Sequence, residues 1–417
     1  SVSPQRKRKK RTRRNATTMR WLFFYVFFVG RQTTALVDTL VLGGGFAGTY
    51  TALQVRRLRP GTSVTVVDER ERFAFLPLLY EYACGVASLD EVSTPFSAFD
   101  FDFVRGTVDS FDPATRTATL ANGDTLTGKT VVLALGKESI CPAGASPFYR
   151  LEDAEALRGN LPDTCVVVGG GFTGVELACH LKAENAKRNV TLVHRSARLV
   201  PSAAEHNRAA AVAALNTLGV HVRLGVGTGT TPEDLAADSD DSEDTTTTAK
   251  VIWTAGARPA KPLRELPAVH KSSKGKDLLA VDAALRLRLA PGDVDRNVFA
   301  LGDAARLPGG GDAQSSAQVA LQQALVAARN VAAYLDDRPA VPFKYVPLGE
   351  LVALGPRDGT ASLLGAGLNL DGAVAGLARR LVYAARMPTP AQRLTSLSGL
   401  ASKKYLSSSS SSSSSSK

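Results

Sequence analysis

The stretch that decides the fold begins Leu40-Val41-Leu42-Gly43-Gly44-Gly45-Phe46-Ala47-Gly48 and ends Ser63-Val64-Thr65-Val66-Val67-Asp68. It predicts a buried strand, a G-x-G-x-x-G turn, a helix and a second strand that ends in an acid. That order is typical of a dinucleotide site, because glycines let the backbone approach a pyrophosphate and the helix N-terminus faces its charge. The carboxylate of Asp68 then stands where it can bond a ribose hydroxyl.

A second copy of this unit begins Cys165-Val166-Val167-Val168-Gly169-Gly170-Gly171-Phe172-Thr173-Gly174. From the first glycine to the residue at the strand end is 25 positions in both copies, Gly43 to Asp68 and Gly169 to His194. Two such units favour a flavin plus a nicotinamide cofactor over a dehydrogenase with one cofactor. The glycines could serve only turns and helix packing, but two complete copies at matched spacing disfavour that alternative.

Further patterns fit an α/β chain. Apolar runs that end in glycine, as buried strands do before a turn, occur at Gly136, Gly256 and Gly302. A helix is expected over residues 316–335. The acidic stretch 231–248 is poor in apolar residues and is expected to form a solvated loop.

Charge and cysteine usage exclude several classes of protein. The 417-residue chain has a net charge of +11, but residues 1–20 carry nine Lys and Arg and no acid, which leaves about +2 for the rest. A nucleic-acid partner would rest on that arm alone, and none is expected. The cysteines show no C-x-x-C spacing, so we expect no disulfide framework, redox cysteine pair or metal site. They are Cys84, Cys141, Cys165 and Cys179.

Residues 1–35 are expected to be a disordered basic arm with a leader or targeting segment. Met19 is followed by Arg20, by nine apolar residues from Trp21 to Val29 and by small residues, which is similar to a secretory-type leader. Nine residues are too few to span a bilayer, which takes ~20. We interpret Met19 as the natural start of the polypeptide, with a genuine basic tail as the alternative.

The C-terminal region predicts an amphipathic helix over residues 373–387. Its apolar side holds Val374, Leu377, Leu381 and Val382, and Arg379, Arg380 and Arg386 lie nearby. Such a helix can lie in a membrane interface with its arginines near anionic headgroups. The alternative is a packing helix with a solvated basic side. Residues 406–417 are a low-complexity Ser tail.

With these motifs the chain resembles the type II NAD(P)H:quinone oxidoreductases, flavoproteins with two dinucleotide-binding domains, from about residue 37 to residue 398. The motifs that carry the resemblance are Pro77-Leu78-Leu79-Tyr80-Glu81, Gly169 to Ala178, Trp253-Thr254-Ala255-Gly256, Leu301-Gly302-Asp303 and Ala317 to Gln323. The C-terminal block is most similar to the plastid branch, the demethylphylloquinone reductases of plants and cyanobacteria. That likeness rests on Leu348-Gly349-Glu350, Ala378 to Tyr383 and Met387-Pro388-Thr389.

The resemblance implies that the first unit holds FAD and the second holds NAD(P)H. The residues implied for FAD are Gly43, Gly45, Phe46, Ala47, Gly48, Asp68, Pro77, Tyr80, Gly136, Gly302 and Asp303. Those implied for the nicotinamide nucleotide are Gly169, Gly171, Gly174, Glu176, His194, Arg195 and Gly256. Glu176 is also expected to be catalytic, near the nicotinamide and the flavin. Gln318 and Gln322 are expected at the quinone end of the site.

Several of these residues have simpler interpretations. Asp303 could be a helix N-cap. Glu176 could be a first-turn acid that the helix dipole favours. Gln318 and Gln322 share a helix face at i and i+4, and that face could simply be exposed.

The second copy departs from the usual pattern, because His194-Arg195 stands where an acid would bind the 2′-hydroxyl of NADH. Nothing there repels a 2′-phosphate, and a guanidinium can pair with one. We therefore predict that NADPH is accepted and favoured. The alternative is a surface His-Arg pair without a ligand.

The expected fold class is α/β, with two Rossmann-like domains, the second inserted in the first, and a C-terminal membrane-associating segment. The expected domains are FAD-binding parts at 36–155 and 276–345, an NAD(P)-binding domain at 156–275, and a C-terminal region at 346–405.

The implied reaction carries hydride from NAD(P)H to FAD, and then two electrons to a lipid-soluble naphthoquinone or plastoquinone such as demethylphylloquinone. The expected location is a thylakoid or plastoglobule surface in a plastid, with the mitochondrial inner membrane surface as the alternative. A homodimer is the assembly considered. The rival functions are a soluble flavoprotein reductase for a protein or for monodehydroascorbate, and a non-enzymatic, nucleotide-responsive interaction protein.

Overall fold

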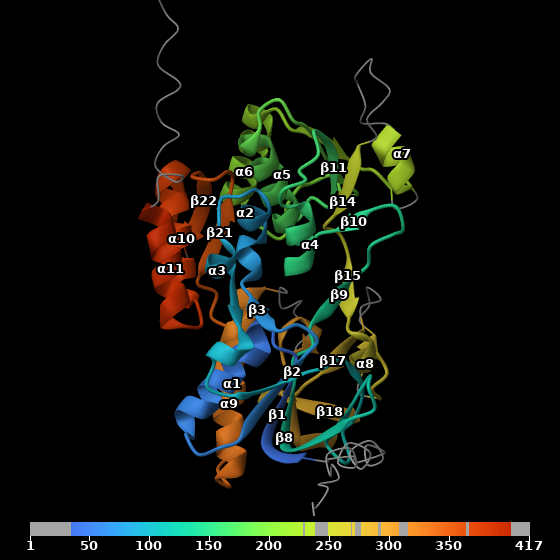
Figure 1. The fold of residues 1–417 in the computed structure, drawn as a ribbon, viewed down its shortest axis with the longest axis vertical. Helices are drawn as coiled ribbons and strands as arrows, with labels where there is room; N and C mark the ends of the chain where they lie inside the picture. Colours follow the sequence, from blue (N-terminus) through green and yellow to red (C-terminus); the bar gives the residue numbers. More distant parts are fainter. Residues whose placement is uncertain are drawn as a thin grey trace, which may run out of the picture.

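The computed structural model describes most of the chain between residues 35 and 401. The described ranges are 35–227, 230–237, 249–267, 269–271, 277–290, 293–307, 316–363 and 367–401. The two dinucleotide-binding units are stacked along the long axis, and the C-terminal elements lie along one edge beside the second unit (Figure 1). The α/β fold class predicted from the sequence is confirmed. The N-terminal leader and the Ser tail lie outside the described residues.

The first unit is built on a largely parallel sheet in the order β18-β19-β8-β1-β2-β5. These strands are β18 (Arg286–Ala290), β19 (Asp293–Ala300), β8 (Thr125–Leu133), β1 (Ala35–Leu42), β2 (Val64–Asp68) and β5 (Asp102–Arg105). Helices α1 (Phe46–Leu58) and α9 (Ala317–Leu335) pack against each other beside this sheet. Strand β2 is buried at every position, as expected for an apolar run in a parallel sheet covered on both faces.

The second unit is a five-stranded parallel sheet in the order β10-β14-β11-β12-β13. Its strands are β10 (Ser146–Pro147), β14 (Lys250–Trp253), β11 (Thr164–Val168), β12 (Asn189–His194) and β13 (His221–Leu224). Its helices include α4 (Leu151–Leu157), α5 (Phe172–Glu184), α6 (Glu205–Leu218) and α7 (Pro232–Ala237). Helix α7 corrects the first part of the expected solvated loop, because Leu235 and Ala236 are buried there. Residues 238–248 of that stretch lie outside the described residues.

An antiparallel pair of strands, β9 (Lys137–Ser139) and β15 (Ala257–Pro259), carries the chain out to the second unit and back. After this return, β19 pairs in parallel with β8 of the first sheet. The second unit therefore lies within the first in sequence, while the boundaries at residues 155, 275 and 345 stay predictions.

Smaller elements complete both units. They are β3 (Arg72–Ala74), η1 (Leu76–Leu78), α2 (Leu79–Ala83), α3 (Leu89–Val92), β4 (Ser93–Pro95), η2 (Phe96–Ala98), β6 (Val108–Asp112), β7 (Thr117–Leu120), α8 (Lys261–Arg264), β16 (Val269–Lys271), β17 (Asp277–Ala280), η3 (Gly302–Ala304) and β20 (Ala305–Arg306).

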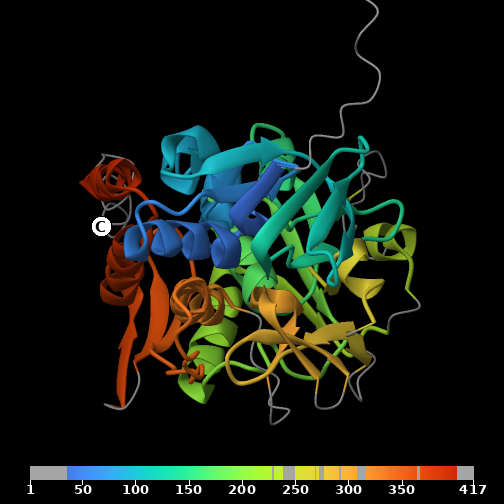
Figure 2. The same cartoon turned by 90° about the horizontal axis from the view of Figure 1, so that it is seen from below.

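The C-terminal block is an antiparallel sheet followed by two helices, coloured red along one edge of the molecule in Figures 1 and 2. It comprises β21 (Gly349–Ala353), β22 (Gly359–Leu363), β23 (Leu368–Asp371), α10 (Gly372–Arg386) and α11 (Pro390–Ala401). Glu350 accepts hydrogen bonds from the Ala204 N–H at 2.8 Å and from the Asn207 amide at 3.2 Å, which ties the block to the second unit. Gln392 bonds Thr94 at 2.6 Å, which ties it to the first.

No helix in the described part of the chain is long and apolar enough to cross a membrane.

Candidate functional site

The first glycine turn has the shape of a pyrophosphate cradle. Gly43 has a φ of +104°, and a Cβ on it would lie 2.4 Å from the Ala134 carbonyl oxygen. A Cβ on Gly48 would lie 1.8 Å from the Gly43 carbonyl oxygen, so only glycine lets α1 approach the turn. A Cβ on Gly45, in contrast, would meet nothing within 4 Å. The two outer glycines thus shape the backbone, and the middle one faces open space where a diphosphate fits.

Asp68 is fixed at the end of β2, where the sequence predicted it. Its carboxylate accepts the Gly44 N–H at 2.7 Å and pairs with Arg70 at 3.0 Å, and it is 5% exposed. The acid is therefore held at the mouth of the cradle, in position for a ribose.

The far wall of the first site comes from the loop after β19. Gly302 has a φ of +74°, and a Cβ on it would lie 3.2 Å from the Cβ of Ala47. Asp303 follows in η3, and burial raises the pKa of its carboxyl group while Lys137 opposes the shift. The Gly302 N–H donates to the buried Gln323 side chain at 2.7 Å. Gln323 is the last residue of the motif Ala317 to Gln323, but the sequence analysis gave it no role, since it singled out only Gln318 and Gln322.

An aromatic wall lies beside the cradle. The buried Phe46 ring packs against Phe73 and Phe75, with centroid distances of 5.3 and 5.1 Å. Pro77 lies in the middle of the turn η1, which leads into α2, and in α2 the side chain of Tyr80 is 2% exposed. Gly136 ends this side of the site at the strand-to-loop turn after β8, with a φ of +64°.

The second turn repeats the geometry of the first. Gly169 has a φ of +120°, and a Cβ on Gly174 would lie 1.8 Å from the Gly169 carbonyl oxygen. Gly171 again opens onto free space, with nothing within 4 Å of an added Cβ. Gly256 has a φ of +73° after β14. The residues present therefore fit a second dinucleotide.

His194 occupies the position in the second unit that Asp68 occupies in the first. Its Nδ1 accepts the Gly170 N–H at 3.1 Å, as the Asp68 carboxylate accepts that of Gly44. This bond requires Nδ1 to be unprotonated, and burial lowers the pKa of the imidazole, helped by the neighbouring Arg195 charge. Arg195 itself is exposed, where its guanidinium can reach a ligand.

Glu176 lies where three parts of the chain meet. It lies in α5 beyond the first turn, which holds no acid, so it is not the first-turn acid of the simpler interpretation. One of its carboxylate oxygens accepts the Tyr80 hydroxyl of α2 at 3.1 Å. The same oxygen accepts the Ala353 N–H of the C-terminal block at 3.1 Å. Burial raises the pKa of Glu176 to about 7, against the opposing effects of the Ala353 bond and the Arg379 charge. Near neutral pH this group can therefore both hold and release a proton.

The two glutamines expected at the quinone end are engaged within the chain. Gln318 Oε1 accepts the Tyr345 hydroxyl at 2.7 Å and the Leu348 N–H at 3.0 Å. Gln322 exchanges hydrogen bonds with the backbone of Val346 at 2.7 and 3.0 Å. The hydrogen bonds of Gln318 and Gln322 thus hold the segment that leads from α9 to the C-terminal sheet against α9.

The places expected for Arg379 and Arg380 were wrong in both interpretations of this helix, since neither arginine is solvated or at the surface. Each is 1% exposed on the inner side of α10. Arg386 is half-buried. Arg379 pairs with Glu81, and Arg380 pairs with Glu81 at 3.1 Å and with Glu91 at 2.6 Å. The expected apolar side is present and faces outward, and its residues are Val374, Leu377, Leu381 and Val382.

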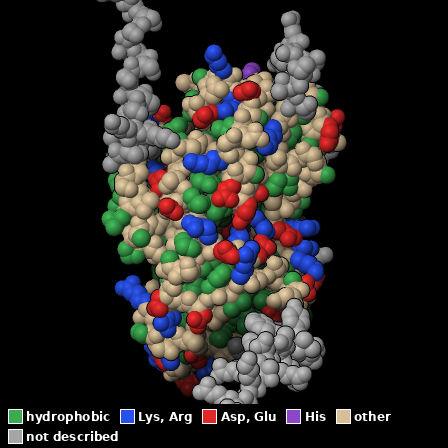
Figure 3. All heavy atoms as spheres, viewed as in Figure 1, with side chains coloured by type: hydrophobic (Ala, Val, Ile, Leu, Met, Phe, Trp, Pro, Cys, Tyr) green, Lys and Arg blue, Asp and Glu red, His purple; other side chains and the backbone are tan. Residues whose placement is uncertain are grey.

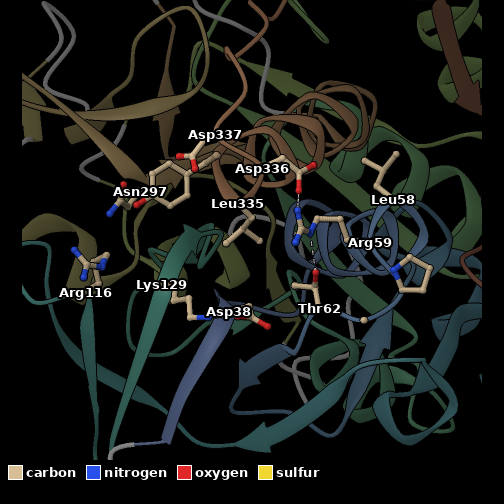
Figure 4. Close-up of a pocket in the computed structure, with 13 residues that line it drawn as sticks. Asp38, Leu58, Arg59, Thr62, Arg116, Lys129, Asn297, Leu335, Asp336 and Asp337 are labelled. Atoms are coloured by element: carbon tan, nitrogen blue, oxygen red, sulfur yellow. Dashed lines mark hydrogen bonds and ion pairs between the residues drawn. The ribbon is translucent and has the colours of Figure 1, made fainter.

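A separate hollow of about 840 Å³ lies towards the amino ends of β1 and β8 (Figure 4). Lys129 pairs with Asp38 there at 2.7 Å, and Arg59 pairs with Asp336. Dinucleotides bind at the carboxyl ends of parallel strands, so this hollow is not the cofactor site.

Comparison with known proteins agrees with this arrangement. Residues 37–328 match the pyridine nucleotide-disulphide oxidoreductase family. The demethylphylloquinone reductase of Synechocystis sp. is 33% identical over 87% of this chain and 95% of that protein. The chloroplastic/mitochondrial alternative NAD(P)H-ubiquinone oxidoreductase C1 of Arabidopsis thaliana is 31% identical over 85% of this chain and 78% of that protein.

Solved structures share the fold at low sequence identity. NDH2 from Plasmodium falciparum, solved in complex with NADH, superposes with a TM-score of 0.69 at 14% identity, over 88% of this chain and 98% of that one. With two nucleotide cradles and relatives that cover nearly its whole length, the chain belongs to the pyridine nucleotide-disulphide oxidoreductase family and, within it, to the type II NAD(P)H:quinone oxidoreductases.

Proposed function

We propose that this enzyme uses FAD to oxidise NADPH and reduce a lipid-soluble quinone of the naphthoquinone or plastoquinone class. The observation that carries the proposal is the pair of complete dinucleotide cradles, with the buried carboxyl group of Glu176 just past the second glycine turn and hydrogen-bonded to Tyr80 of α2. FAD bound in the first cradle supplies the hydride-accepting and two-electron-donating chemistry. The cradles of Gly45 and Gly171 bind the two diphosphates, and Asp68 orients the adenosine ribose of the flavin nucleotide.

The overall reaction, NADPH + H⁺ + quinone → NADP⁺ + quinol, consumes one proton besides the hydride. Glu176 is the group that holds this proton, because its pKa of about 7 leaves it partly protonated at neutral pH. The Tyr80 hydroxyl and the Ala353 N–H keep the carboxyl group in one orientation.

The preference for NADPH rests on the absence of an acid at the end of β12. With Nδ1 of His194 accepting the Gly170 N–H, the imidazole is neutral and brings no negative charge, and the exposed Arg195 guanidinium beside it is a donor. Donors favour a 2′-phosphate, whereas a carboxylate would repel it.

The lipid-soluble substrate requires contact with a membrane, and we propose that the outer side of α10 and α11 provides it. Six aliphatic side chains are exposed there: Val374, Leu377, Leu381, Val382, Leu394 and Leu397. Green side chains lie along this edge in Figure 3. Such a surface binds at the interface without crossing the bilayer. The likeness to the cyanobacterial and chloroplastic proteins supports a thylakoid or plastoglobule surface, with the mitochondrial inner membrane surface as the alternative. Formation of a homodimer stays a prediction.

The test of the reaction is a steady-state assay of flavin-loaded protein with NADPH or NADH against a naphthoquinone, a benzoquinone and ferricyanide. We expect quinone-dependent oxidation with a higher kcat/KM for NADPH than for NADH. Activity with ferricyanide but with neither quinone would contradict the proposal and favour a soluble flavoprotein reductase. Nucleotide binding without turnover of any acceptor would favour a non-enzymatic interaction protein.

The membrane surface is tested by flotation with vesicles that contain anionic lipid. Leu377→Gln with Leu381→Gln should lower the vesicle-bound fraction and leave activity with a soluble quinone unchanged. Leu58→Gln is the matched control, since that leucine is 43% exposed on α1. Truncation of α10 is unsuitable, because it would remove Arg379 and Arg380 and leave Glu81 and Glu91 buried without partners. Equal flotation of the double leucine variant and the Leu58→Gln control would exclude this surface as the membrane contact.

A further inference from the structure

Four charged groups lie in the interior where α10 packs on α2 and α3. Arg379 and Arg380 are each 1% exposed, Glu81 is 0% exposed and Glu91 is 5% exposed. Desolvating such groups costs several kcal/mol per ion, and apolar residues of similar volume often stabilise a protein as well or better. Helix packing alone therefore does not account for the cluster.

A continuous set of contacts leads from this cluster to the site. Arg379 donates to Glu81 and, through its other terminal nitrogen, to the Tyr80 hydroxyl at 3.2 Å. The Tyr80 hydroxyl in turn donates to Glu176 at 3.1 Å. The Arg379 guanidinium also lies 5.4 Å from the centre of the Tyr383 ring. A residue of the C-terminal helix thus contacts the only side chain that the described structure shows hydrogen-bonded to the Glu176 carboxylate.

We propose that Arg379 and Glu81 are positioning residues for the quinone half-reaction, and that their ion pair aligns Tyr80 and Glu176 for proton delivery. The inference rests on the proposed function, because it assigns a role within the reduction of the quinone. Neither residue touches the substrate. They act through the Tyr80 hydroxyl and through their charges.

The charges of the cluster predict the direction in which each substitution shifts the pKa of Glu176. Burial is the largest cause of the raised Glu176 pKa, but the Arg379 charge lowers that pKa and the Glu81 charge raises it. The titratable groups around the carboxyl group are Tyr80, Glu81, Cys179, His180, Arg379 and Tyr383. Burial lowers the pKa of His180 to about 4 and raises the pKa of Tyr80, Cys179 and Tyr383, so these four stay neutral near pH 7. Of these six groups, Arg379 and Glu81 carry opposed charges, and Arg380 and Glu91 are the other two charges of the cluster.

The experiment measures reoxidation of the NADPH-reduced, flavin-loaded enzyme in a stopped-flow instrument between pH 5.5 and 9, with a soluble naphthoquinone or with ferricyanide. Quinone requires a proton and ferricyanide does not. For the wild type, the quinone rate should fall as pH rises through about 7, whereas the ferricyanide rate should stay flat. Arg379→Met should move the fall to higher pH, by about one unit or more, because an attractive positive charge is lost. Glu81→Gln should move it to lower pH.

Arg380→Met is the matched control, because Arg380 is equally buried on the same helix and pairs with Glu81 and Glu91. It should lower stability and leave the pH profile of the quinone step in place. If Arg379→Met does not fold, the double variant Arg379→Met with Glu81→Gln keeps the buried charge balanced, and Arg379→Lys keeps the positive charge. The double variant should return the midpoint close to that of the wild type, with a slower quinone rate because Tyr80 has lost its donor.

Two results would overturn the inference. Shifts of the same sign for Arg379→Met and Glu81→Gln would show that the charges do not act on Glu176. Equal losses with quinone and with ferricyanide would show a merely structural role. A wild-type enzyme that passes electrons to ferricyanide but to no quinone would instead overturn the proposed function, and this inference with it.

Discussion

The two cradles have the same backbone conformation, but a different side chain accepts the hydrogen bond from the glycine turn in each. In each, the first glycine has a positive φ, the second is open and the third touches the first. In each, the residue that ends the second strand accepts an N–H from the glycine turn, but it is Asp68 in one and His194 in the other. The shared backbone explains how both sites take a diphosphate. We propose that the changed side chain at the strand end determines which ribose each site prefers.

The strongest way to separate the two cradles is to fill their open glycines. Neither Gly45 nor Gly171 has protein within 4 Å of an added Cβ, and both have negative φ, so a side chain at either position enters the ligand's space without straining the backbone. Gly45→Val should abolish FAD retention and lower activity by about 100-fold or more, a loss of roughly 2.7 kcal/mol of binding. Gly171→Val should keep FAD and raise the KM for NADPH. Absorbance of bound flavin separates the two outcomes, and loss of flavin from both variants would contradict the assignment of the cradles.

Removing the acceptor of the first cradle should have the next largest effect. Asp68→Ala leaves the Gly44 N–H and the Arg70 guanidinium without their carboxylate partner. Hydrogen bonds to charged groups contribute about 1.5–3 kcal/mol, so FAD affinity should fall by roughly 10- to 100-fold. Titration of the apoprotein with FAD measures this. His194→Ala is the counterpart, and it should leave FAD affinity unchanged.

Exchanging the charge next to the second acceptor should change nucleotide choice. Arg195→Glu should lower the ratio of kcat/KM for NADPH to that for NADH by about tenfold, or ~1.4 kcal/mol, because a carboxylate replaces the donor for the 2′-phosphate. Arg198→Glu is the control, since Arg198 pairs with Glu205 at 3.1 Å on the exposed surface. An unchanged ratio in Arg195→Glu would remove the basis for a preference for NADPH.

The smallest expected difference between the cradles is one of pH. The pKa of His194 is lowered in the folded protein, so its contribution to stability is complete above the unfolded value of 6.5 and is lost as pH falls below it. Protonation of Nδ1 removes the acceptor for Gly170. The Tm of the wild type should therefore drop more between pH 7 and pH 5.5 than that of His194→Asn, whose amide oxygen accepts the same bond without titrating. Parallel curves would show that His194 makes no such contribution.

The sequence predicted both cradles because their geometry depends on residues close together in the chain. The interval of 25 residues placed His194 opposite Asp68, and the structure has both in the same relation to their turns. The sequence could not show that Arg379 and Arg380 are buried, because their partners Glu81 and Glu91 lie 298 and 289 residues away along the chain. A helix pattern separates an apolar side from a charged side, and it does not say which of them faces the protein. Here the charged side does.

The attachment of Glu350 to α6 limits how the two units can move. The connection through β9 and β15 alone would act as a hinge, and many two-domain enzymes close around their substrates on such a hinge. The C-terminal block holds the second unit through Glu350 and the first through Gln392 and the buried arginines, so a swinging motion would have to break all of these contacts. These contacts therefore oppose a change in the distance between the two cradles. We therefore expect turnover to depend on the diffusion of nucleotide and quinone to their sites and not on a domain motion. Solvent viscosity should then affect turnover only through that diffusion.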